Sequence, residues 1–246
     1  MGALHDGHRA LVHAAVASEA FVITSIFVNP AQFAATEDLS RYPRDEAGDL
    51  AVLEAAGCEL VWMPDVATMY PADDATTISV SGPSENWESA ARPGHFQGVA
   101  TVCAKLFGQT WAGKAYFGEK DWQQLQVIRR MVADLHLPLE IVAVETIREP
   151  DGLAMSSRNR FLSATDRERA PLLYRVLVDS VAASRIDAAA ALRTARERLT
   201  DAGFSVDYFA LVDGVSLREI PHPVPNARII AAARLGTVRL LDNIAV

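Results

Sequence analysis

The hydrophobic positions in the first 150 residues alternate between helical spacing and short apolar runs. In residues 6–17, Leu11, Val12 and Val16 recur at the spacing of an amphipathic helix. The run 21–28 is almost wholly apolar and rich in β-branched residues, which is typical of a parallel strand buried on both faces. The same pattern then repeats. It predicts a helix over about 45–56 and strands over 59–63, 115–118 and 139–144, with further helices between them. This alternation predicts a Rossmann-like, doubly wound parallel α/β sheet.

Two stretches interrupt this alternation. Residues 38–45 are polar and are expected to form a loop. Residues 64–97 contain several prolines, with one short alternating strand expected at 76–80.

A different pattern begins near residue 148. Two Ala/Arg-rich helices are expected over about 165–183 and 187–200. They are followed by segments that alternate as antiparallel strands do, at 206–211, 227–233 and 237–244. We therefore expect an α/β domain over 1–147 and a smaller C-terminal α+β domain over 148–246.

Composition and charge narrow the function classes. The chain is 50% hydrophobic and 22% charged, which is ordinary for a globular protein, and its net charge of −8 argues against a nucleic-acid partner. Cys58 and Cys103 have no CxxC partner, so we interpret them as buried residues in a reducing compartment. No apolar run reaches the length of a membrane span, and no signal peptide is recognisable. These features predict a cytoplasmic protein without a membrane partner.

Two histidines mark the start of the first predicted helix. His5 and His8 lie on one side of its first turn, where unpaired N–H groups and the helix dipole favour an anion. Gly7 would let a ligand approach the backbone. The pattern allows a bound nucleotide triphosphate, but also two solvated histidines at an ordinary helix start.

Polar residues follow two further elements. Asn29 and Gln32 come after the strand expected at 21–28, where α/β proteins bind ligands, although Asn-Pro is also a common turn sequence. Arg92 and His95 lie in a glycine-containing loop before a helix, where a lone histidine is more often structural.

Two later segments have the chemistry of phosphate binding. Gly118, Lys120 and Asp121 lie at a strand-to-helix turn, which suits phosphate and ribose recognition, and Gln124 follows on a part of the helix expected to face the same site. The loop at 156–158 reads Ser-Ser-Arg, whose hydroxyls and guanidinium can surround a triphosphate. By itself this short motif is weak evidence.

Taken together, the motifs identify a family. The chain contains, in order, His5-x-Gly7-His8, residues 117–121 as Phe-Gly-Glu-Lys-Asp, and residues 155–159 as Met-Ser-Ser-Arg-Asn. The first motif alone is shared by the H-x-G-H nucleotidylyltransferase superfamily. With the later motifs and residues 27–33, 92–96 and 235–244, the whole chain resembles the pantothenate synthetase (pantoate–β-alanine ligase) family.

The resemblance implies a two-step reaction. Pantoate attacks the α-phosphorus of Mg-ATP to give pantoyl adenylate and pyrophosphate, and β-alanine then displaces AMP to give pantothenate. His8 is implied as the general acid, with His5, Lys120 and Arg158 also acting on the phosphates. The implied ATP site comprises Met1, Gly2, His5, Gly7, His8, Gly118, Glu119, Lys120, Asp121, Ile147, Met155, Ser156, Ser157 and Arg158. The implied substrate-binding residues are Asn29, Gln32, Arg92, His95 and Gln124. The family further implies a C-terminal lid and a homodimer.

The sequence departs from the family pattern in two places. The residues that usually precede the first motif, including a central strand, are absent before Met1, so we expect a sheet without its first strand. Where the family has adjacent acidic residues linked to Mg²⁺, this chain has Gly48 and Asp49, which leaves Asp49 as the candidate metal ligand. Alternative interpretations are a truncated nucleotide-binding module that has lost catalysis, and another nucleotidylyltransferase of the same superfamily.

Overall fold

A computed structural model describes residues 2–18, 21–33 and 44–246. The chain divides into two compact units, the first containing Met1–Glu119 and Gln123–Glu145 and the second Lys120–Trp122 and Thr146–Val246. The first unit has parallel strands and the second an antiparallel three-stranded sheet, as expected for an α/β part followed by an α+β part. Most of the loop expected at 38–45 lies outside the described residues.

The described strands of the first unit form two parallel pairs. β1 (Ile23–Ser25) pairs with β2 (Leu60–Trp62), and β3 (Lys114–Gly118) pairs with β4 (Glu140–Val144). The apolar run 21–28 therefore contributes a shorter strand than expected, because only three of its residues pair with β2.

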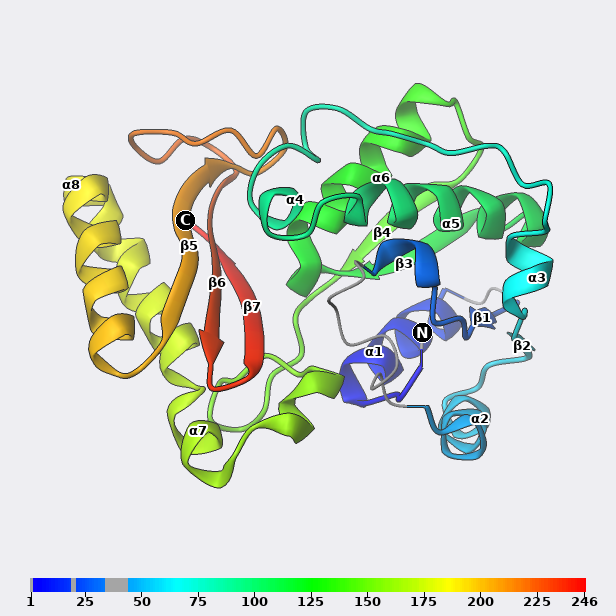
Figure 1. The fold of residues 1–246 in the computed structure, drawn as a ribbon, viewed down its shortest axis with the longest axis horizontal. Coiled ribbons are helices and arrows are strands. Elements are labelled where there is room, and N and C mark those ends of the chain that lie inside the picture. Colours follow the sequence, from blue (N-terminus) through cyan, green and yellow to red (C-terminus); the bar gives the residue numbers. More distant parts are fainter. Residues whose placement is uncertain (1, 19–20, 34–43) are drawn as a thin grey trace. The chain divides into compact units, whose positions relative to one another are not determined.

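Helices cover both faces of these strands (Figure 1). Tyr116 and Phe117 are consecutive on β3, so their side chains point to opposite faces. Tyr116 packs into the cluster that contains residues of α1 (Asp6–Val16) and α2 (Glu46–Ala55), and Phe117 packs into the cluster of α5 (His95–Thr110) and α6 (Trp122–Asp134). This two-sided burial confirms the doubly wound arrangement. The helices are α1 (Asp6–Val16), α2 (Glu46–Ala55), α3 (Val66–Met69), α4 (Glu88–Ala91), α5 (His95–Thr110) and α6 (Trp122–Asp134).

The prediction of a strand at 76–80 is wrong. These residues form no strand, and the irregular region around them instead contains the short helices α3 and α4. Ile78 donates its backbone N–H to Thr101 Oγ1 of α5 (2.9 Å). The side chains of Ile78 and Val80 pack against the α5–α6 cluster. The alternating pattern therefore reflects packing on helices and a side-chain hydrogen bond, without a neighbouring strand.

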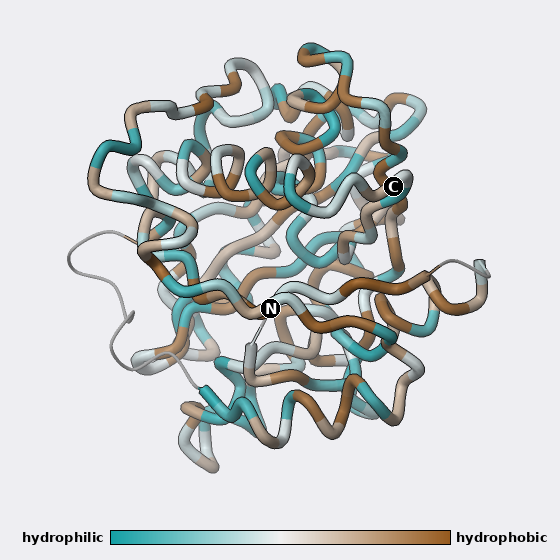
Figure 2. The backbone as a smooth tube through the Cα atoms, turned by 90° about the vertical axis from the view of Figure 1, so that its right-hand side faces the viewer, coloured by the Kyte–Doolittle hydropathy of each residue, from teal (hydrophilic) through white to brown (hydrophobic). Residues whose placement is uncertain are grey.

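The second unit is built on an antiparallel sheet. Strands β5 (Ser205–Asp213), β6 (Ala227–Leu235) and β7 (Val238–Ala245) are ordered β5-β6-β7, and the long helix α8 (Leu172–Asp201) packs against them through a continuous apolar core. Figure 2 shows hydrophobic and hydrophilic residues alternating along the coiled segments that face the viewer, the pattern expected of helices packed on one side.

The helices of this unit begin and end differently from expectation. The helix expected at 165–183 is divided into α7 (Ala164–Arg169) and the start of α8. The division falls at Pro171, because proline has no backbone N–H to donate to a carbonyl of the preceding helical turn. The expected break near 187 is a kink within α8, where Asp187 has non-helical backbone angles. Asp187 Oδ1 accepts the N–H of Ala190 (2.9 Å) and so caps the second half of α8.

Candidate functional site

The two histidines form a capped turn at the N-terminus of α1. His5 Nδ1 accepts the N–H of Gly7 (3.1 Å), and His8 Nδ1 accepts the N–H of His5 (3.3 Å). The rings lie side by side, with centroids 4.1 Å apart. Because both Nδ1 atoms act as acceptors, a neutral ring at either position carries its proton on Nε2. The turn thus fixes the tautomer of two imidazoles beside a helix N-terminus, where a phosphate is favoured.

Asp49 holds the chain immediately before this turn. Its carboxylate accepts the N–H of Ala3 on Oδ2 (2.8 Å) and of Leu4 on Oδ1 (2.6 Å), and the residue is only 4% exposed. Ala3 has a left-handed backbone (φ +49°), which is unfavourable for a residue with a Cβ. The structure therefore gives Asp49 a positioning role at the histidine turn. Its role as a metal ligand stays a prediction.

Asn29 and Gln32 belong to one polar cluster in the first unit, at the 3₁₀ helix η1 (Pro30–Gln32). Asn29 is 2% exposed, and its Oδ1 accepts from the Ala31 N–H (3.2 Å) and the Tyr70 hydroxyl (2.7 Å). Its Nδ2 donates to Gly98 O (3.1 Å) and Gln32 Oε1 (3.2 Å). The side-chain amide of Asn29 therefore uses both its oxygen and its nitrogen in hydrogen bonds within the protein, and it orients the Gln32 amide. The Nε2 of Gln32 makes no hydrogen bond with the described residues.

Arg92 and His95 hold the backbone of the same residue. Arg92 Nη1 contacts His95 Nε2 (3.0 Å), and His95 Nδ1 contacts Gln32 O (3.0 Å). Since a guanidinium can only donate, Nε2 is the acceptor and Nδ1 donates to the carbonyl oxygen. The structure thus brings together Asn29, Gln32, Arg92 and His95, and Gln32 is their common partner.

Two residues of this cluster have no signal in the sequence. Gly98 lies against η1, where a Cβ would be 2.3 Å from Ala31 O, so α5 can approach η1 only with glycine at this position. Tyr70 donates to Asn29, and burial raises the pKa of Tyr70 to about 12, so its hydroxyl remains a donor at neutral pH. Both contacts join segments that are distant in sequence.

The adjacent glutamines of α6 have different environments. Gln123 is buried, with Oε1 accepting the Glu88 N–H (3.0 Å) and Nε2 donating to Pro83 O (2.9 Å). Its amide therefore fastens the loop before α5 to α6. The side-chain amide of Gln124 makes no hydrogen bond with the described residues, and so none with the Gln32 cluster. Of the two, Gln124 has the amide that is available to a ligand.

Gly118 ends β3 and precedes the predicted phosphate-binding residues. Apart from its two chain neighbours, a Cβ at this position would meet no atom of the described residues within 4 Å. Glu119 follows as the first residue of the 3₁₀ helix η3 (Glu119–Asp121). The first unit therefore has open space next to Gly118, as required for close approach of a ligand to the backbone.

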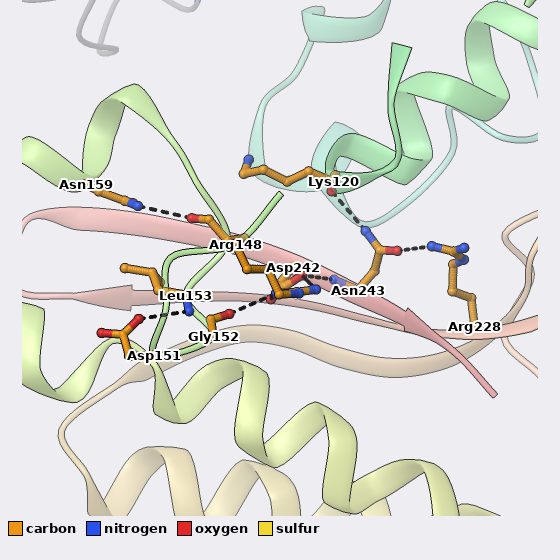
Figure 3. Close-up of polar contacts among 10 residues, drawn as sticks. Lys120, Arg148, Asp151, Gly152, Leu153, Asn159, Arg228, Asp242 and Asn243 are labelled. Carbon is orange, nitrogen blue, oxygen red and sulfur yellow. Dashed lines mark hydrogen bonds and ion pairs between the residues drawn. The ribbon is translucent and has the colours of Figure 1, made fainter. Parts of the chain in front are cut away.

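Lys120 and Asp121 belong to the second unit. Lys120 Nζ lies 3.3 Å from Asp121 Oδ1, and the backbone carbonyl of Lys120 accepts a hydrogen bond from Asn243 of β7 (2.9 Å; Figure 3). The lysine is thus attached to the C-terminal sheet through its main chain, while its ammonium group makes only this one solvent-accessible ion pair among the described contacts.

The Ser-Ser-Arg motif begins the 3₁₀ helix η4 (Ser157–Phe161). Ser156 Oγ caps it by accepting the Arg158 N–H (3.3 Å). The preceding segment is a tight hairpin in which the Met155 N–H donates to Ile147 O (3.0 Å). The N–H of Ile147, a residue of the implied ATP site, has no hydrogen-bond partner among the described residues, so a backbone donor is available there to a ligand.

The described residues do not form a metal site of their own. They contain no group of three or more His, Cys, Asp or Glu side chains that could hold an ion.

Cys58 and Cys103 are free and partly buried, and burial raises the pKa of the Cys103 thiol to about 12, so it is not a reactive thiolate at neutral pH. In the part of the chain that is described, none of the helices has both the length and the apolar character of a membrane span. Gly2 precedes the histidine turn, and Met1 lies outside the described residues.

A doubly wound α/β unit with an H-x-G-H turn at a helix N-terminus defines a protein of the nucleotidylyltransferase class. The family model described as pantoate–β-alanine ligase matches residues 1–245. The chain belongs to this family.

Similar proteins agree over nearly the whole chain. A pantothenate synthetase of Granulibacter bethesdensis is 58% identical, over 99% of this chain and 86% of its own length. The crystal structure of pantothenate synthetase from Thermus thermophilus is 50% identical with a TM-score of 0.95, covering 99% of this chain and 90% of that one. A pantoate–β-alanine ligase from Francisella tularensis, crystallised with β-γ ATP and β-alanine, is 33% identical with a TM-score of 0.84, covering 100% and 87% of the two chains.

Proposed function

We propose that this chain ligates pantoate and β-alanine to pantothenate at the expense of ATP, releasing AMP and pyrophosphate. Membership of the pantoate–β-alanine ligase family supports this reaction. The observation that carries the proposal is the capped turn of His5 and His8, whose Nδ1 atoms both accept backbone hydrogen bonds. A nucleotide triphosphate at this helix N-terminus would meet imidazole Nε2–H donors instead of unprotonated nitrogens.

In the first step, a carboxylate oxygen of pantoate bonds to the α-phosphorus, and the bond from that phosphorus to the bridging oxygen breaks. Negative charge then accumulates on the departing pyrophosphate. His8 acts as the general acid for this leaving group, and His5 donates a hydrogen bond to a neighbouring phosphate oxygen. Gly2 and Gly7 supply backbone without side chains, and Met1 completes this part of the ATP site.

The remaining nucleotide-binding residues stabilise charge and position the base. Lys120 and Arg158 place positive charge on the phosphates, where the transition state gathers negative charge. Ile147 donates its N–H to adenine. The segment 155–158 forms a lid over the phosphates. The residues that line the rest of the ATP site are Gly118, Glu119, Asp121, Met155, Ser156 and Ser157.

Pantoate is held by neutral amides. Gln32 and Gln124 bind its carboxylate and hydroxyls without an ion pair that would weaken the nucleophile. Asn29, Arg92 and His95 act on pantoate through Gln32, which they fix from its side chain and its carbonyl. In the second step the amine of β-alanine attacks the acyl carbon, the new C–N bond forms, and AMP leaves. A dry pocket protects the adenylate from hydrolysis meanwhile.

Magnesium enters as part of the substrate Mg-ATP. Both Asp49 oxygens accept backbone hydrogen bonds, and the described residues contain no group of three or more His, Cys, Asp or Glu side chains that could hold an ion, so they do not fit a metal site built by the protein alone. Mg²⁺ commonly retains several waters and binds phosphates directly, so this arrangement suffices. We therefore assign no step of the reaction to a metal held by Asp49.

We further propose a homodimer in the cytoplasm. The family resemblance supports the dimer, and the free thiols of Cys58 and Cys103 support a reducing compartment. Sedimentation equilibrium should give twice the chain mass, and cell fractionation should recover the protein with cytosolic markers. A monomer at micromolar concentration, or recovery with membranes, would contradict these assignments.

The decisive assay is isotope exchange between pyrophosphate and ATP. Exchange should depend on pantoate, and His8→Ala should abolish it with only the small loss of stability expected when one helix-cap hydrogen bond is removed. Tight ATP binding without exchange would instead identify a catalytically inactive nucleotide-binding module. Exchange with another carboxylic acid but not with pantoate would identify a different member of the superfamily.

A variant of Gln124 tests the assignment of the pantoate site. Gln124→Ala should raise the KM for pantoate at least tenfold and that for ATP less than twofold. Gln123→Ala is the matched control, because its amide binds the 83–88 loop, and it should lower stability. Equal effects of Gln124→Ala on both KM values would refute the assignment.

A further inference from the structure

We infer that Asp242 and Asn243, consecutive residues of β7, are positioning residues for ATP. Asn243 fixes the segment that carries Lys120, and Asp242 fixes the hairpin that leads into the loop of Met155–Arg158. The side chain of Asn243 donates to the Lys120 carbonyl and that of Asp242 binds Arg148, so we infer that they act through the residues that they hold. The inference rests on the proposed function, because it assumes that Lys120 and Arg158 act on the phosphates.

Asn243 is hydrogen-bonded on both sides of its amide (Figure 3). Nδ2 donates to Lys120 O (2.9 Å), and Oδ1 accepts from Arg228 Nη1. The Arg228 guanidinium in turn stacks on the indole of Trp122, 3.4 Å from the ring centroid, and Trp122 Nε1 donates to Gly214 O (2.7 Å). The segment Lys120–Trp122 is therefore attached to the second unit at both of its ends.

Asp242 makes an equally specific contact with the hairpin. Its carboxylate binds Arg148 in a bidentate ion pair (2.6 and 2.9 Å), and its side chain is only 3% exposed. Arg148 also donates to Gly152 O at the tip of the hairpin (3.1 Å) and stacks over the ring of Tyr174, 3.6 Å from its centroid. The guanidinium thus ties the two arms of the hairpin to β7.

The two contacts share one point of the sheet. Asp242 and Asn243 pair with Ala231 and Ile230 of β6, and the Asn243 N–H donates to Asp242 Oδ1 (2.8 Å). Side chains of consecutive strand residues point to opposite faces, so this dipeptide can hold two segments at once. A shift of either side chain would be transmitted to its neighbour through the shared peptide.

This arrangement is better explained by positioning than by stability. A buried ion pair is often no more stabilising than an apolar pair of the same volume, because both charges lose their hydration. What such a pair provides here is a single geometry for the groups attached to it. Groups that stabilise a transition state must be held within about 0.5 Å of their working positions, and hydrogen-bonded supports supply that precision.

The test uses Asn243→Asp in the full chain. This isosteric change keeps an oxygen for Arg228 but replaces the Nδ2 donor to Lys120 O by a second carboxylate oxygen. In pantoate-dependent ATP–pyrophosphate exchange we expect kcat/KM for ATP to fall at least tenfold, with the KM for pantoate within twofold of wild type. Asp207→Asn is the matched control, because it weakens the Arg239–Asp207 ion pair (2.6 Å) of the same sheet and touches neither segment. It should leave both constants unchanged.

A double-mutant cycle with Lys120→Ala separates positioning from structure. Lys120→Ala removes the ammonium group but keeps the carbonyl that Asn243 binds. If Asn243 acts through the lysine, Asn243→Asp should change kcat/KM for ATP less than twofold in the Lys120→Ala background. A full tenfold loss there, or an equal loss of pantoate affinity in the single variant, would overturn the inference.

Two further measurements keep the outcomes distinct. If Asn243→Asp fails to fold, Trp122→Phe loosens the same segment by removing the bond to Gly214 and leaving Arg228 a smaller ring to stack on, and an unchanged kcat/KM for ATP in that variant would overturn the inference. If the wild-type chain shows no exchange, the proposed reaction is wrong. The ATP dissociation constant, measured by calorimetry, then tests positioning by itself, and it should rise at least fivefold in Asn243→Asp.

Discussion

Replacing Asp49 by asparagine tests how the histidine turn is held. The carboxylate accepts two backbone hydrogen bonds, from Ala3 (2.8 Å) and Leu4 (2.6 Å). Asparagine has nearly the same shape but offers only one oxygen, so its amide group would face an N–H donor. A hydrogen bond to a charged group contributes roughly 1.5–3 kcal/mol, and an unsatisfied buried N–H costs a similar amount. We therefore expect the free energy of unfolding to fall by about 2–4 kcal/mol.

Part of this cost can be relieved by movement of the turn. Ala3 has a left-handed backbone, which is unfavourable by roughly 1–2 kcal/mol, and releasing Ala3 from Asp49 would recover this energy. Such a release would move His5, which directly follows Leu4. The loss should then be shared between stability and catalysis, and each 1.4 kcal/mol of lost transition-state binding corresponds to about a tenfold lower rate constant. We expect kcat/KM for ATP to fall tenfold to a hundredfold.

The assay combines urea unfolding with pyrophosphate exchange at several Mg²⁺ concentrations. Asp45→Asn is the matched control, because Asp45 caps the same helix by accepting the Gly48 N–H (3.0 Å), and asparagine is an equally good cap. It should be close to wild type in both measurements. If Asp49→Asn keeps wild-type stability but needs much more Mg²⁺ for half-maximal exchange, Asp49 is a metal ligand and our reasoning about the turn is refuted.

Three further predictions follow from the packing of glycines and the environment of Tyr70. Gly98→Ala should cost about 1–3 kcal/mol and raise the KM for pantoate, because a Cβ would lie 2.3 Å from Ala31 O; wild-type melting would contradict this. Gly118→Ala should leave melting unchanged or slightly raised, since no atom among the described residues opposes the Cβ, but should reduce kcat/KM for ATP; a fully active variant would place the nucleotide elsewhere. Burial raises the pKa of Tyr70 from 10.0 to about 12, so the protonated phenol contributes stability that is complete below pH 10 and is lost as the pH rises towards 12. The melting-temperature difference between wild type and Tyr70→Phe should therefore shrink over this range, and a constant difference would show that Tyr70 does not titrate there.

The order and type of most elements could be predicted from local patterns. The amphipathic spacing of residues 6–17 and the apolar segments near 60, 115 and 140 correspond to α1, β2, β3 and β4. These predictions hold because side-chain burial has a period of about 3.6 in helices and 2 in strands, which is a property of neighbouring residues. The same reasoning fails at 76–80, where the apolar side chains are covered by helices far along the chain.

The candidate site was visible in the sequence as residue types, but not as roles. The motifs place histidines, a lysine and an arginine where a nucleotide enzyme would need them. They do not show that Asn29 is occupied by Tyr70 and Gly98 while Gln32 has an amide to offer. That difference depends on hydrogen bonds between residues 41 and 69 positions apart.

What the sequence by itself determined is therefore the family, the alternation of helices and strands, and the set of chemically able side chains. Only the tertiary structure decided which of those side chains are already satisfied by the protein. Asp49, Gln123 and Asn243 have ordinary polar sequence surroundings, yet each binds backbone groups from a distant segment. A buried polar group must find its partner wherever the folded chain brings one within about 3 Å, and local spacing contains no record of that partner.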